Sequence, residues 1–219
     1  MARLPRLALG GHVHYVIQRG HGGCAVFNDE IDRAAFRAAL SEAAATERVQ
    51  VHACALLPTE VQLLVTPAEP AALSRLMQAV GRRYVGAYNR RHGRRGTLWD
   101  GRFHCGVVEP GPLRLQAQCL IDGAAAEPGA TSAPHRSGGP RDALLSDPPE
   151  YWQLGNTPFE REAAYRRLLD AGVDAVAAAQ LRDAALGGWA AGSTAFRAGL
   201  AAAAARPMQP RPRGRPRRA

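Results

Sequence analysis

The sequence predicts an α+β fold. Two observations predict it: apolar runs of strand length recur at 12–19, 51–57, 60–66 and 102–109, and apolar residues at helical spacing fill the first and third of the intervals between them. The resulting order is strand–helix–strand–strand–helix–strand, which is typical of a ferredoxin-like βαββαβ unit. We expect a C-terminal helical extension and a basic tail to follow this unit.

The central pair of predicted strands forms a hairpin around residues 58–59, where proline and threonine interrupt the apolar run. Side chains alternate between the two faces of a strand. Glu60, Gln62 and Leu64 therefore point to one face, and the apolar residues between them point to the other. The second strand of the hairpin thus begins with two polar groups presented side by side.

The two predicted helices of this unit each have one apolar face. Asn28 can cap the first helix, in which Phe36 and Leu40 recur at helical spacing and which ends near Arg48. The second helix starts at Pro70, and its buried stripe is expected to consist of Leu73, Met77, Val80 and Tyr84. Both helices are therefore expected to pack one face on the sheet.

The composition indicates a soluble, basic protein. The formal net charge is +9, and all 28 basic residues are arginines, which suits binding to an anionic polymer; GC-rich coding is an alternative reason for the absence of lysine. The chain has neither a run of eighteen apolar residues nor an apolar signal-peptide core at its start, so we expect a cytoplasmic protein without membrane contact. Its four widely spaced cysteines are expected to be free thiols.

The densest basic stretch lies at 81–103 and interleaves seven arginines with aromatic residues. Guanidinium groups neutralise phosphates and flat rings stack on unpaired bases, so this stretch is the candidate DNA-binding segment. The alternative is a solvated helix end with a basic loop. Within the stretch, Tyr84 is expected to pack in the core, and Trp99 has the alternative role of a loop anchor. The candidate DNA-binding residues here are Arg82, Arg83, Arg90, Arg91, Arg94, Arg95 and Arg102, with Tyr84, Tyr88, Trp99 and Phe103 as the aromatic residues.

Four segments match one family pattern. Residues 52–67, His-Ala-Cys-Ala-Leu-Leu-Pro-Thr-Glu-Val-Gln-Leu-Leu-Val-Thr-Pro, follow H-A-x-x-L-M-x-N-H-x-H-L-L-V-T-P. Residues 14–20, the arginine stretch at 81–103, and the Gly-Trp-x-x-Gly-Ser-x-x-Phe string at 188–196 match as well. In these segments the chain resembles the REP-associated tyrosine transposases, which are HUH single-strand transposases. The resemblance independently implies a ferredoxin-like fold and a DNA substrate.

The resemblance also implies where the chemistry of the family would lie. Its two metal-binding histidines fall on Glu60 and Gln62, and an active member would be expected to use Mg²⁺ or Mn²⁺. Its nucleophilic tyrosine falls on Leu120, or on Cys119 if the alignment shifts by one residue. No tyrosine lies between Tyr88 and Tyr151. All three motif positions therefore depart from the family pattern.

These departures predict a DNA-binding, transposase-like protein that recognises hairpin or single-stranded DNA and has lost strand cleavage and transfer. No bound cofactor is expected. One alternative is an active metal-dependent single-strand DNA transposase or nuclease with substituted ligands, and another is a decaying gene product.

The domain organisation follows from composition. We expect a DNA-binding domain at 1–127, a linker rich in glycine, proline and serine at 128–149, a helical extension at 150–205 and an arginine-rich disordered tail at 206–219. Within the tail, Arg213 and Arg215 resemble the core of an AT-hook, which would enter an A/T-rich minor groove. The protein is expected to be a monomer or a homodimer.

Overall fold

The chain forms a mixed α/β structure, described by a computed structural model for residues 6–127, 129–204 and 206–209. The mixed class predicted from the sequence is confirmed. Within the described residues there are five strands and seven α-helices. In chain order they are β1 Val13–Arg19, α1 Glu30–Glu47, β2 Val49–Leu57, β3 Glu60–Pro67, α2 Ala72–Arg91, β4 His104–Val108, α3 Pro112–Asp122, α4 Pro149–Trp152, α5 Pro158–Ala171, α6 Ala175–Gly187, β5 Ala190–Ala191 and α7 Thr194–Ala204.

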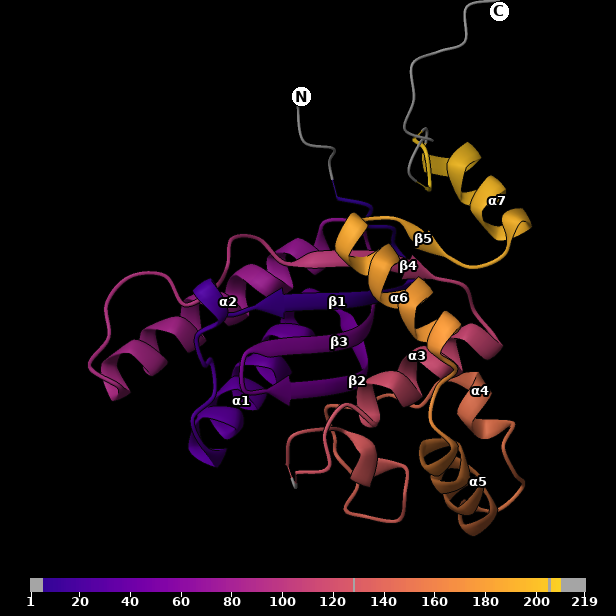
Figure 1. Ribbon diagram of the computed structural model, residues 1–219, viewed down its shortest axis with the longest axis horizontal. Coiled ribbons are helices and arrows are strands. Elements are labelled where there is room, and N and C mark those ends of the chain that lie inside the picture. The colour runs from indigo at the N-terminus through magenta and orange to yellow at the C-terminus, as the bar shows by residue number, and fades with distance from the viewer. Residues whose placement is uncertain (1–5, 128, 205, 210–219) are drawn as a thin grey trace, which may run out of the picture.

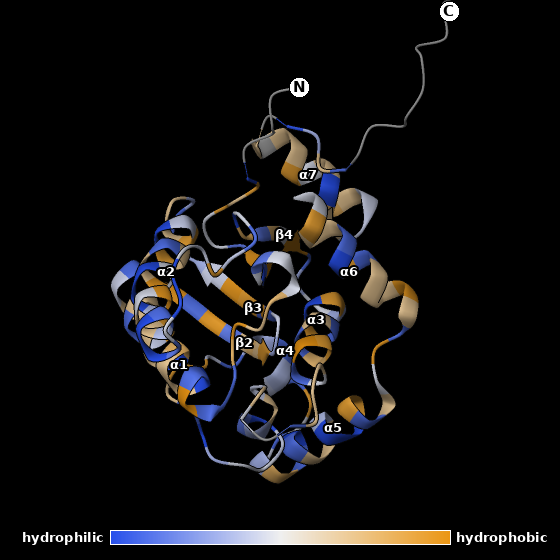
Figure 2. Cartoon of the chain, turned by 60° about the vertical axis from the view of Figure 1, so that its left-hand side comes forward, coloured by the Kyte–Doolittle hydropathy of each residue, from blue (hydrophilic) through white to orange (hydrophobic). Residues whose placement is uncertain are grey.

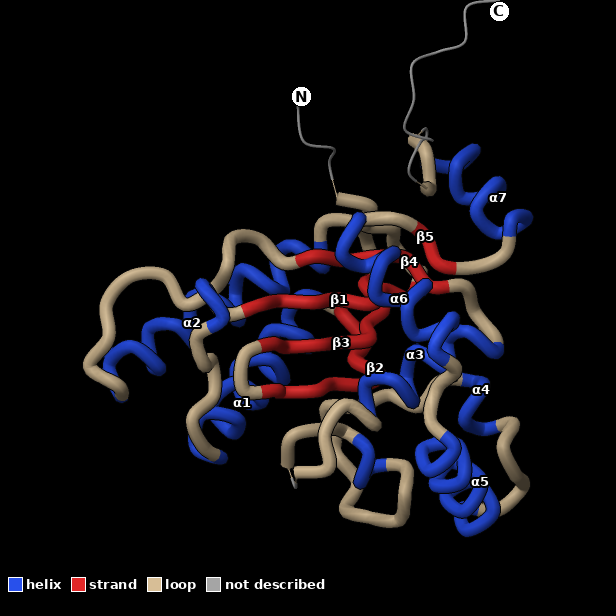
Figure 3. The backbone as a smooth tube through the Cα atoms, in the orientation of Figure 1, coloured by secondary structure: helices blue, strands red, loops and turns tan. Residues whose placement is uncertain are grey.

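The strands form one sheet in the order β2-β3-β1-β4-β5. β2 and β3 make the hairpin predicted around residues 58–59, and β1 lies antiparallel between β3 and β4. The short β5 runs parallel to β4 at the edge. Figures 1 and 3 show helices on both sides of this sheet. The central strands β1 and β3 are therefore buried on both faces.

Helices α1 and α2 cover one face of the sheet. Phe36 and Leu40 of α1 and Tyr84 of α2 belong to the same core cluster as Val16 and Leu63 of the sheet. In Figure 2 both helices carry hydrophilic and hydrophobic residues in bands, as expected for helices with one buried face. The stripe predicted for α2 is confirmed, because all four of its residues are buried: Leu73, Met77, Val80 and Tyr84.

The cap of α1 lies one residue later than predicted. Asp29, not Asn28, is the N-cap, and its carboxylate accepts a hydrogen bond from the backbone N–H of Asp32 at 3.1 Å. The Asp32 carboxylate in turn accepts from the backbone N–H of Asn28 at 2.9 Å. Asp29 is the cap because its pairing with Asp32 satisfies two backbone N–H donors at the start of the helix.

Helices α3 and α6 cover the opposite face. Ile121 of α3 and Leu181 of α6 pack with Tyr15, Ile17 and Leu64 of the sheet. On β4, a Cβ atom placed at position 106 would lie 2.7 Å from the Trp189 carbonyl oxygen and 2.8 Å from the Ala184 carbonyl. Glycine therefore lets the end of α6 and the loop after it approach β4 directly.

Residues 129–149, which the sequence analysis assigned to a linker, contain one short 3-10 turn at Ala133–His135. The segment lies along β2, the edge strand of the sheet. Leu56 N–H donates to the Ala130 carbonyl at 2.7 Å, and Ser146 N–H donates to the Val51 carbonyl at 2.8 Å. These bonds satisfy part of a strand edge that would otherwise expose unpaired backbone groups.

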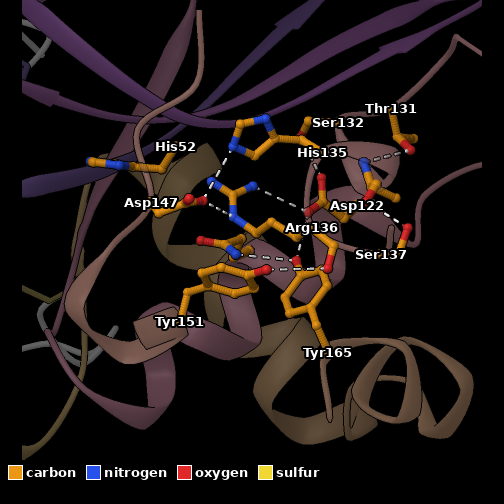
Figure 4. Close-up of polar contacts among 12 residues, drawn as sticks. His52, Asp122, Thr131, Ser132, His135, Arg136, Ser137, Asp147, Tyr151 and Tyr165 are labelled. Atoms are coloured by element: carbon orange, nitrogen blue, oxygen red, sulfur yellow. Dashed lines mark hydrogen bonds and ion pairs between the residues drawn. The ribbon is translucent and has the colours of Figure 1, made fainter. Parts of the chain in front are cut away.

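A buried polar network joins this segment to α3 and α5 (Figure 4). Arg136 has no exposed surface. Its guanidinium lies 2.9 Å from the Asp147 carboxylate and 3.7 Å from that of Asp122. Tyr165 of α5 donates a hydrogen bond to Asp122 at 2.6 Å, and Ser132 donates to the other oxygen of that carboxylate. Charged groups this deeply buried are tolerated because they are paired.

The C-terminal elements close the sheet at the β4–β5 edge. Leu200 of α7 and Met208 form a small cluster with Leu7, Val107 and Ala190, so segments from the two ends of the described chain meet there (Figure 1). Among the helices of the described residues, none has the length and apolar character that crossing a membrane requires.

Candidate functional site

Strand β3 presents Glu60 and Gln62 on the sheet face that α3 and α6 cover. Leu64 of the same strand belongs to the core cluster on that face, whereas Val61 and Leu63 belong to the cluster under α1 and α2. The alternation expected from the sequence is thus present. Both polar side chains are buried, so their partners must come from the protein itself.

Those partners form a continuous polar chain. The Tyr15 hydroxyl donates to Gln62 Oε1 at 2.6 Å, and Gln62 Nε2 donates to Glu60 Oε1 at 2.8 Å. Arg19 Nε donates to Glu60 Oε2 at 2.9 Å, and Arg182 Nη2 of α6 approaches Glu60 Oε1 at 3.4 Å. Gln62 can lie between Tyr15 and Glu60 in this series of hydrogen bonds because an amide both accepts and donates.

This donor set does not fit Mg²⁺ or Mn²⁺. An ion of this kind prefers several oxygen ligands, whereas these two positions offer one carboxylate and one neutral amide, whose oxygens already accept hydrogen bonds from the protein. Two guanidinium groups next to one carboxylate would also repel a divalent cation. In the described parts of the chain, no group of three or more His, Cys, Asp or Glu residues is placed to hold a metal ion.

Tyr15 is the tyrosine that the structure brings to these positions. Its ring has no exposed surface, and burial raises the pKa of its hydroxyl to about 12. The hydroxyl is held as a hydrogen-bond donor to Gln62 and has no access to solvent. Tyr15, Arg19 and Arg182 were not among the residues that the sequence predicted for this site. Antiparallel pairing of β1 with β3, which places Arg19 opposite Glu60, is the signal that could have indicated Arg19.

The predicted nucleophile position lies on α3. Leu120 packs against the apolar cluster between the sheet, α3 and α6. Its neighbour Cys119 is buried with Tyr151 and Tyr165, and burial raises the pKa of its thiol to about 11. Neither side chain offers a nucleophile to an external phosphate.

The candidate DNA-binding arginines lie in the C-terminal half of α2 and in the loop that leads to β4. Two of the seven are committed to carboxylates: Arg83 pairs with Glu42, and Arg91 pairs with Asp29 and Asp32. Arg94 lies 5.8 Å from the centre of the Tyr88 ring. In the described chain five of the seven form no ion pair; we call them the arginine surface, namely Arg82, Arg90, Arg94, Arg95 and Arg102.

Arg91 ties the end of α2 to the start of α1. Its guanidinium lies 2.5 Å from a carboxylate oxygen of Asp29 and 2.5 Å from one of Asp32. The hydrogen bond from Arg91 to Asp29 is the main cause that lowers the pKa of Asp29 to about 2, well below its usual value. Arg91 thus contributes to holding the two helices together, a contact that sequence spacing alone did not reveal.

Three of the four interleaved aromatic residues are too buried to stack on bases, which was expected of Tyr84 as part of the buried stripe of α2 but not of Tyr88 and Phe103. Tyr84, Tyr88 and Phe103 are buried. The Tyr88 hydroxyl donates to the Ala25 carbonyl at 3.0 Å, and Tyr84 donates to that of Val26. The two tyrosines thus join α2 to the segment before α1 through these hydrogen bonds. Trp99 is half-buried and packs on the same cluster.

The two tail arginines proposed for minor-groove contact, Arg213 and Arg215, lie outside the described residues. The AT-hook resemblance stays a prediction.

The fold and contacts together define a mixed α/β protein whose arginine surface forms no ion pair with the described residues. No protein-family profile matches the chain, and no curated protein matches it. Among solved structures, it is similar to a REP-associated tyrosine transposase bound to a REP hairpin, at 13% identity and a TM-score of 0.45, over 55% of this chain and 70% of that one. It is also similar to a candidate transposase from Deinococcus radiodurans R1, at 21% identity and a TM-score of 0.39, over 50% of this chain and 88% of that one.

Proposed function

We propose that this chain is a DNA-binding protein of the transposase-like kind, built on a ferredoxin-like core, that recognises hairpin or single-stranded DNA and no longer cleaves or transfers it. The observation that carries the proposal is the arginine surface. Its five cations lie within one stretch of chain and have no carboxylate partner in the described residues.

The electrostatic argument compares this surface with the rest of the molecule. Arginines elsewhere commonly face carboxylates, as Arg75 does with Glu47 and Arg136 with Asp147. A group of guanidiniums without carboxylate partners, four exposed and one half-buried, raises the local positive potential and suits a partner with regularly spaced phosphates. Because the rings of α2 are buried, phosphate contact rather than base stacking supplies the affinity in this proposal.

The proposed loss of cleavage rests on three positions. Glu60 and Gln62 are occupied by hydrogen bonds from the protein, Leu120 lies against the core, and Tyr15 is enclosed. A metal-assisted attack by tyrosine needs an ion with open positions and a nucleophile that reaches the scissile phosphate. The arrangement of these side chains supports neither requirement.

Binding is tested with a fluorescent hairpin oligonucleotide titrated at several salt concentrations. Each phosphate contact contributes a slope of about −0.9 to the plot of log K against log salt. We expect Arg95→Gln to weaken binding and to reduce the slope by about one. Arg167→Gln, an exposed arginine of α5 that forms no ion pair in the described chain, removes the same charge and should change neither quantity.

Cleavage is tested with the same oligonucleotide in Mg²⁺ and in Mn²⁺. We expect neither nicked strand nor covalent protein–DNA adduct. An adduct on any tyrosine would overturn the proposed loss of strand transfer, and hairpin binding no tighter for the wild type than for Arg95→Gln would overturn the proposed interface.

A further inference from the structure

Two arginines that are far apart in the sequence meet at one buried carboxylate. Arg19 ends β1 and lies opposite Glu60 in the antiparallel pairing of β1 with β3. Its Nε donates to Glu60 Oε2 at 2.9 Å. Arg182 reaches the same carboxylate from α6, where its Nη2 donates to Glu60 Oε1 at 3.4 Å. We call Arg19 and Arg182 the arginine clamp.

The arginine clamp carries more positive charge than its carboxylate balances. In the part of the chain that the structure describes, Glu60 is the one acidic residue with which either arginine forms an ion pair. A buried carboxylate needs a cation beside it, and one guanidinium meets that need. The second guanidinium leaves a surplus of positive charge, which attracts an anion.

Both side chains of the arginine clamp reach solvent. The side chain of Arg19 is 43% exposed and that of Arg182 is 36% exposed, whereas that of Glu60 is 12% exposed. A guanidinium has five N–H groups. Arg19 donates to Glu60 through Nε, and Arg182 donates through Nη2 and also lies beside the Tyr15 hydroxyl. Several N–H donors on each side chain are therefore left for a ligand.

The arrangement of the two guanidiniums suits a phosphate. They contact different oxygens of one carboxylate. A phosphodiester likewise has two non-bridging oxygens on one atom, and its oxygens accept paired N–H groups from arginine. Two donors that are spaced to reach both oxygens of a carboxylate can also reach both oxygens of a phosphate. Because Glu60 already orients the arginines, binding costs less side-chain entropy.

The arginine clamp adjoins the arginine surface. The backbone N–H of Asp100 donates to the Arg19 carbonyl at 2.8 Å, and Gly20 pairs with Trp99 in a short antiparallel bridge. These contacts place the end of β1 against the loop that carries part of the arginine surface. The Asp100 carboxylate lies 3.9 Å from His21 and forms no ion pair with Arg19. A strand that lies along the loop can therefore continue to the clamp.

A competing explanation is that Arg182 only fastens α6 to the sheet. The apolar residues Leu181, Ala184 and Ala185 of α6 already pack in the core cluster on this face. A partly exposed ion pair at 3.4 Å contributes little to stability by comparison. Fastening α6 therefore does not account for a second guanidinium at Glu60.

We propose that the arginine clamp binds one backbone phosphate of the DNA strand that lies on the arginine surface. The inference rests on the proposed function, which supplies the ligand, and deepens it by naming two residues that hold one phosphodiester from both sides.

The first measurement titrates the hairpin oligonucleotide against Arg19→Gln and Arg182→Gln in the full chain. Each variant leaves one guanidinium on Glu60, so the buried carboxylate keeps a cation. We expect about tenfold weaker binding for each and a salt slope reduced by about one, as for the loss of one charged contact. Arg167→Gln is the matched control and should behave as the wild type. Binding of both clamp variants at the wild-type level would overturn the inference.

A charge-preserving variant separates phosphate recognition from a general effect of charge. Arg182→Lys keeps the positive charge but loses the planar pair of donors. We expect weaker binding than in the wild type with an unchanged salt slope. Affinity equal to that of the wild type would contradict recognition by the guanidinium.

The second measurement identifies the phosphate. Each phosphodiester of the hairpin is replaced in turn by an uncharged methylphosphonate. We expect one position at which the replacement weakens binding to the wild type and has a smaller effect on both Arg19→Gln and Arg182→Gln, because the contact is already partly lost. In Arg167→Gln the same replacement should have its full effect. Coupling of the two arginines to different positions would overturn the single shared phosphate.

The outcomes distinguish this inference from the proposed function. If Arg95→Gln weakens hairpin binding but no methylphosphonate position couples to Arg19 or Arg182, the arginine clamp fails while the proposed function stands. If the wild type binds the hairpin no more tightly than Arg95→Gln does, the proposed function fails and the clamp fails with it.

Discussion

Gln62 connects a hydrogen-bond donor, Tyr15, to a hydrogen-bond acceptor, Glu60, on the sheet face that α3 and α6 cover. Its amide accepts from the Tyr15 hydroxyl and donates to the Glu60 carboxylate. The carboxylate is then balanced by Arg19 and Arg182, which approach from the end of β1 and from α6. At the scale of single residues, two positions that the family resemblance assigns to metal ligands thus have a complete set of protein partners.

The first prediction concerns the hydrogen bond from Tyr15 to Gln62. Tyr15→Phe removes the donor to Gln62 Oε1 and leaves that oxygen buried without a partner, so we expect the free energy of unfolding to fall by about 1–3 kcal/mol. Urea denaturation at pH 7 measures the change. The double variant Tyr15→Phe/Gln62→Met should cost less than the sum of the two single variants, and additive costs would contradict the contact.

The second prediction concerns pH. Burial is the main cause that lowers the pKa of His14 and of His52 to about 4. The unfolded chain binds protons near pH 6.5, whereas the folded chain binds them only near pH 4, so the folded state loses stability as the pH falls through this window. The loss from each histidine is on the order of 3 kcal/mol at the lower end of this window.

Denaturation midpoints measured between pH 7 and pH 4 check this loss. His52 Nδ1 donates to the Ser146 carbonyl at 3.0 Å, a bond that an amide can also make. We therefore expect His52→Gln to reduce the dependence of stability on pH in this window. A variant with the full pH dependence of the wild type would show that His52 does not contribute to it.

At the scale of elements, the position of α6 decides what covers the central strands. The helix lies directly on β4 because position 106 has no side chain, and it carries Arg182 to Glu60. At its C-terminal end, the Leu186 and Gly188 carbonyls accept hydrogen bonds from His104 and Arg206. One helix therefore contributes a partner to Glu60 and also contacts the entry to β4.

The third prediction tests this docking. Gly106→Ala places a Cβ within 2.8 Å of the backbone of Ala184, so we expect the free energy of unfolding to fall by about 1–3 kcal/mol as α6 shifts. Gly81→Ala in α2 is the matched control, because a Cβ there meets nothing within 4 Å. It should stabilise the protein by up to about 1 kcal/mol through helix propensity. Equal effects of the two changes would contradict the close approach.

At the scale of the whole molecule, a buried ionic network joins the sheet layer to the C-terminal helices. Arg136 lies between Asp122 of α3 and Asp147, and Tyr165 brings α5 to the same carboxylate (Figure 4). Burial raises the pKa of Asp122, since the charged form loses solvation. The segment 129–149 is thereby attached to the body of the protein at its middle as well as along β2.

The fourth prediction removes the centre of this network. Arg136→Met leaves two buried carboxylates without their shared cation, so we expect a loss of about 3–5 kcal/mol and faster proteolysis within 129–149. Arg141→Met is the control: Arg141 pairs with the same Asp147 at 2.8 Å, but its side chain is 61% exposed. An exposed pair contributes about 1 kcal/mol or less, and a comparable loss in both variants would contradict the central role of Arg136.

The sequence by itself determined the alternating strands, the two helices that cover the first face and the concentration of arginine after Tyr84, because hydrophobic periodicity and charge are local properties of the chain. Asp29 rather than Asn28 is the helix cap because Asp29 accepts from the Asp32 N–H while the Asp32 carboxylate accepts from the Asn28 N–H. The spacing of residues alone does not distinguish the two neighbouring candidates. The tertiary structure alone decided which arginines are paired and which aromatic rings are buried. It also decided that Arg19 and Arg182 meet at Glu60. These contacts join residues tens to hundreds of positions apart, so they exist only once the sheet and its helices have packed.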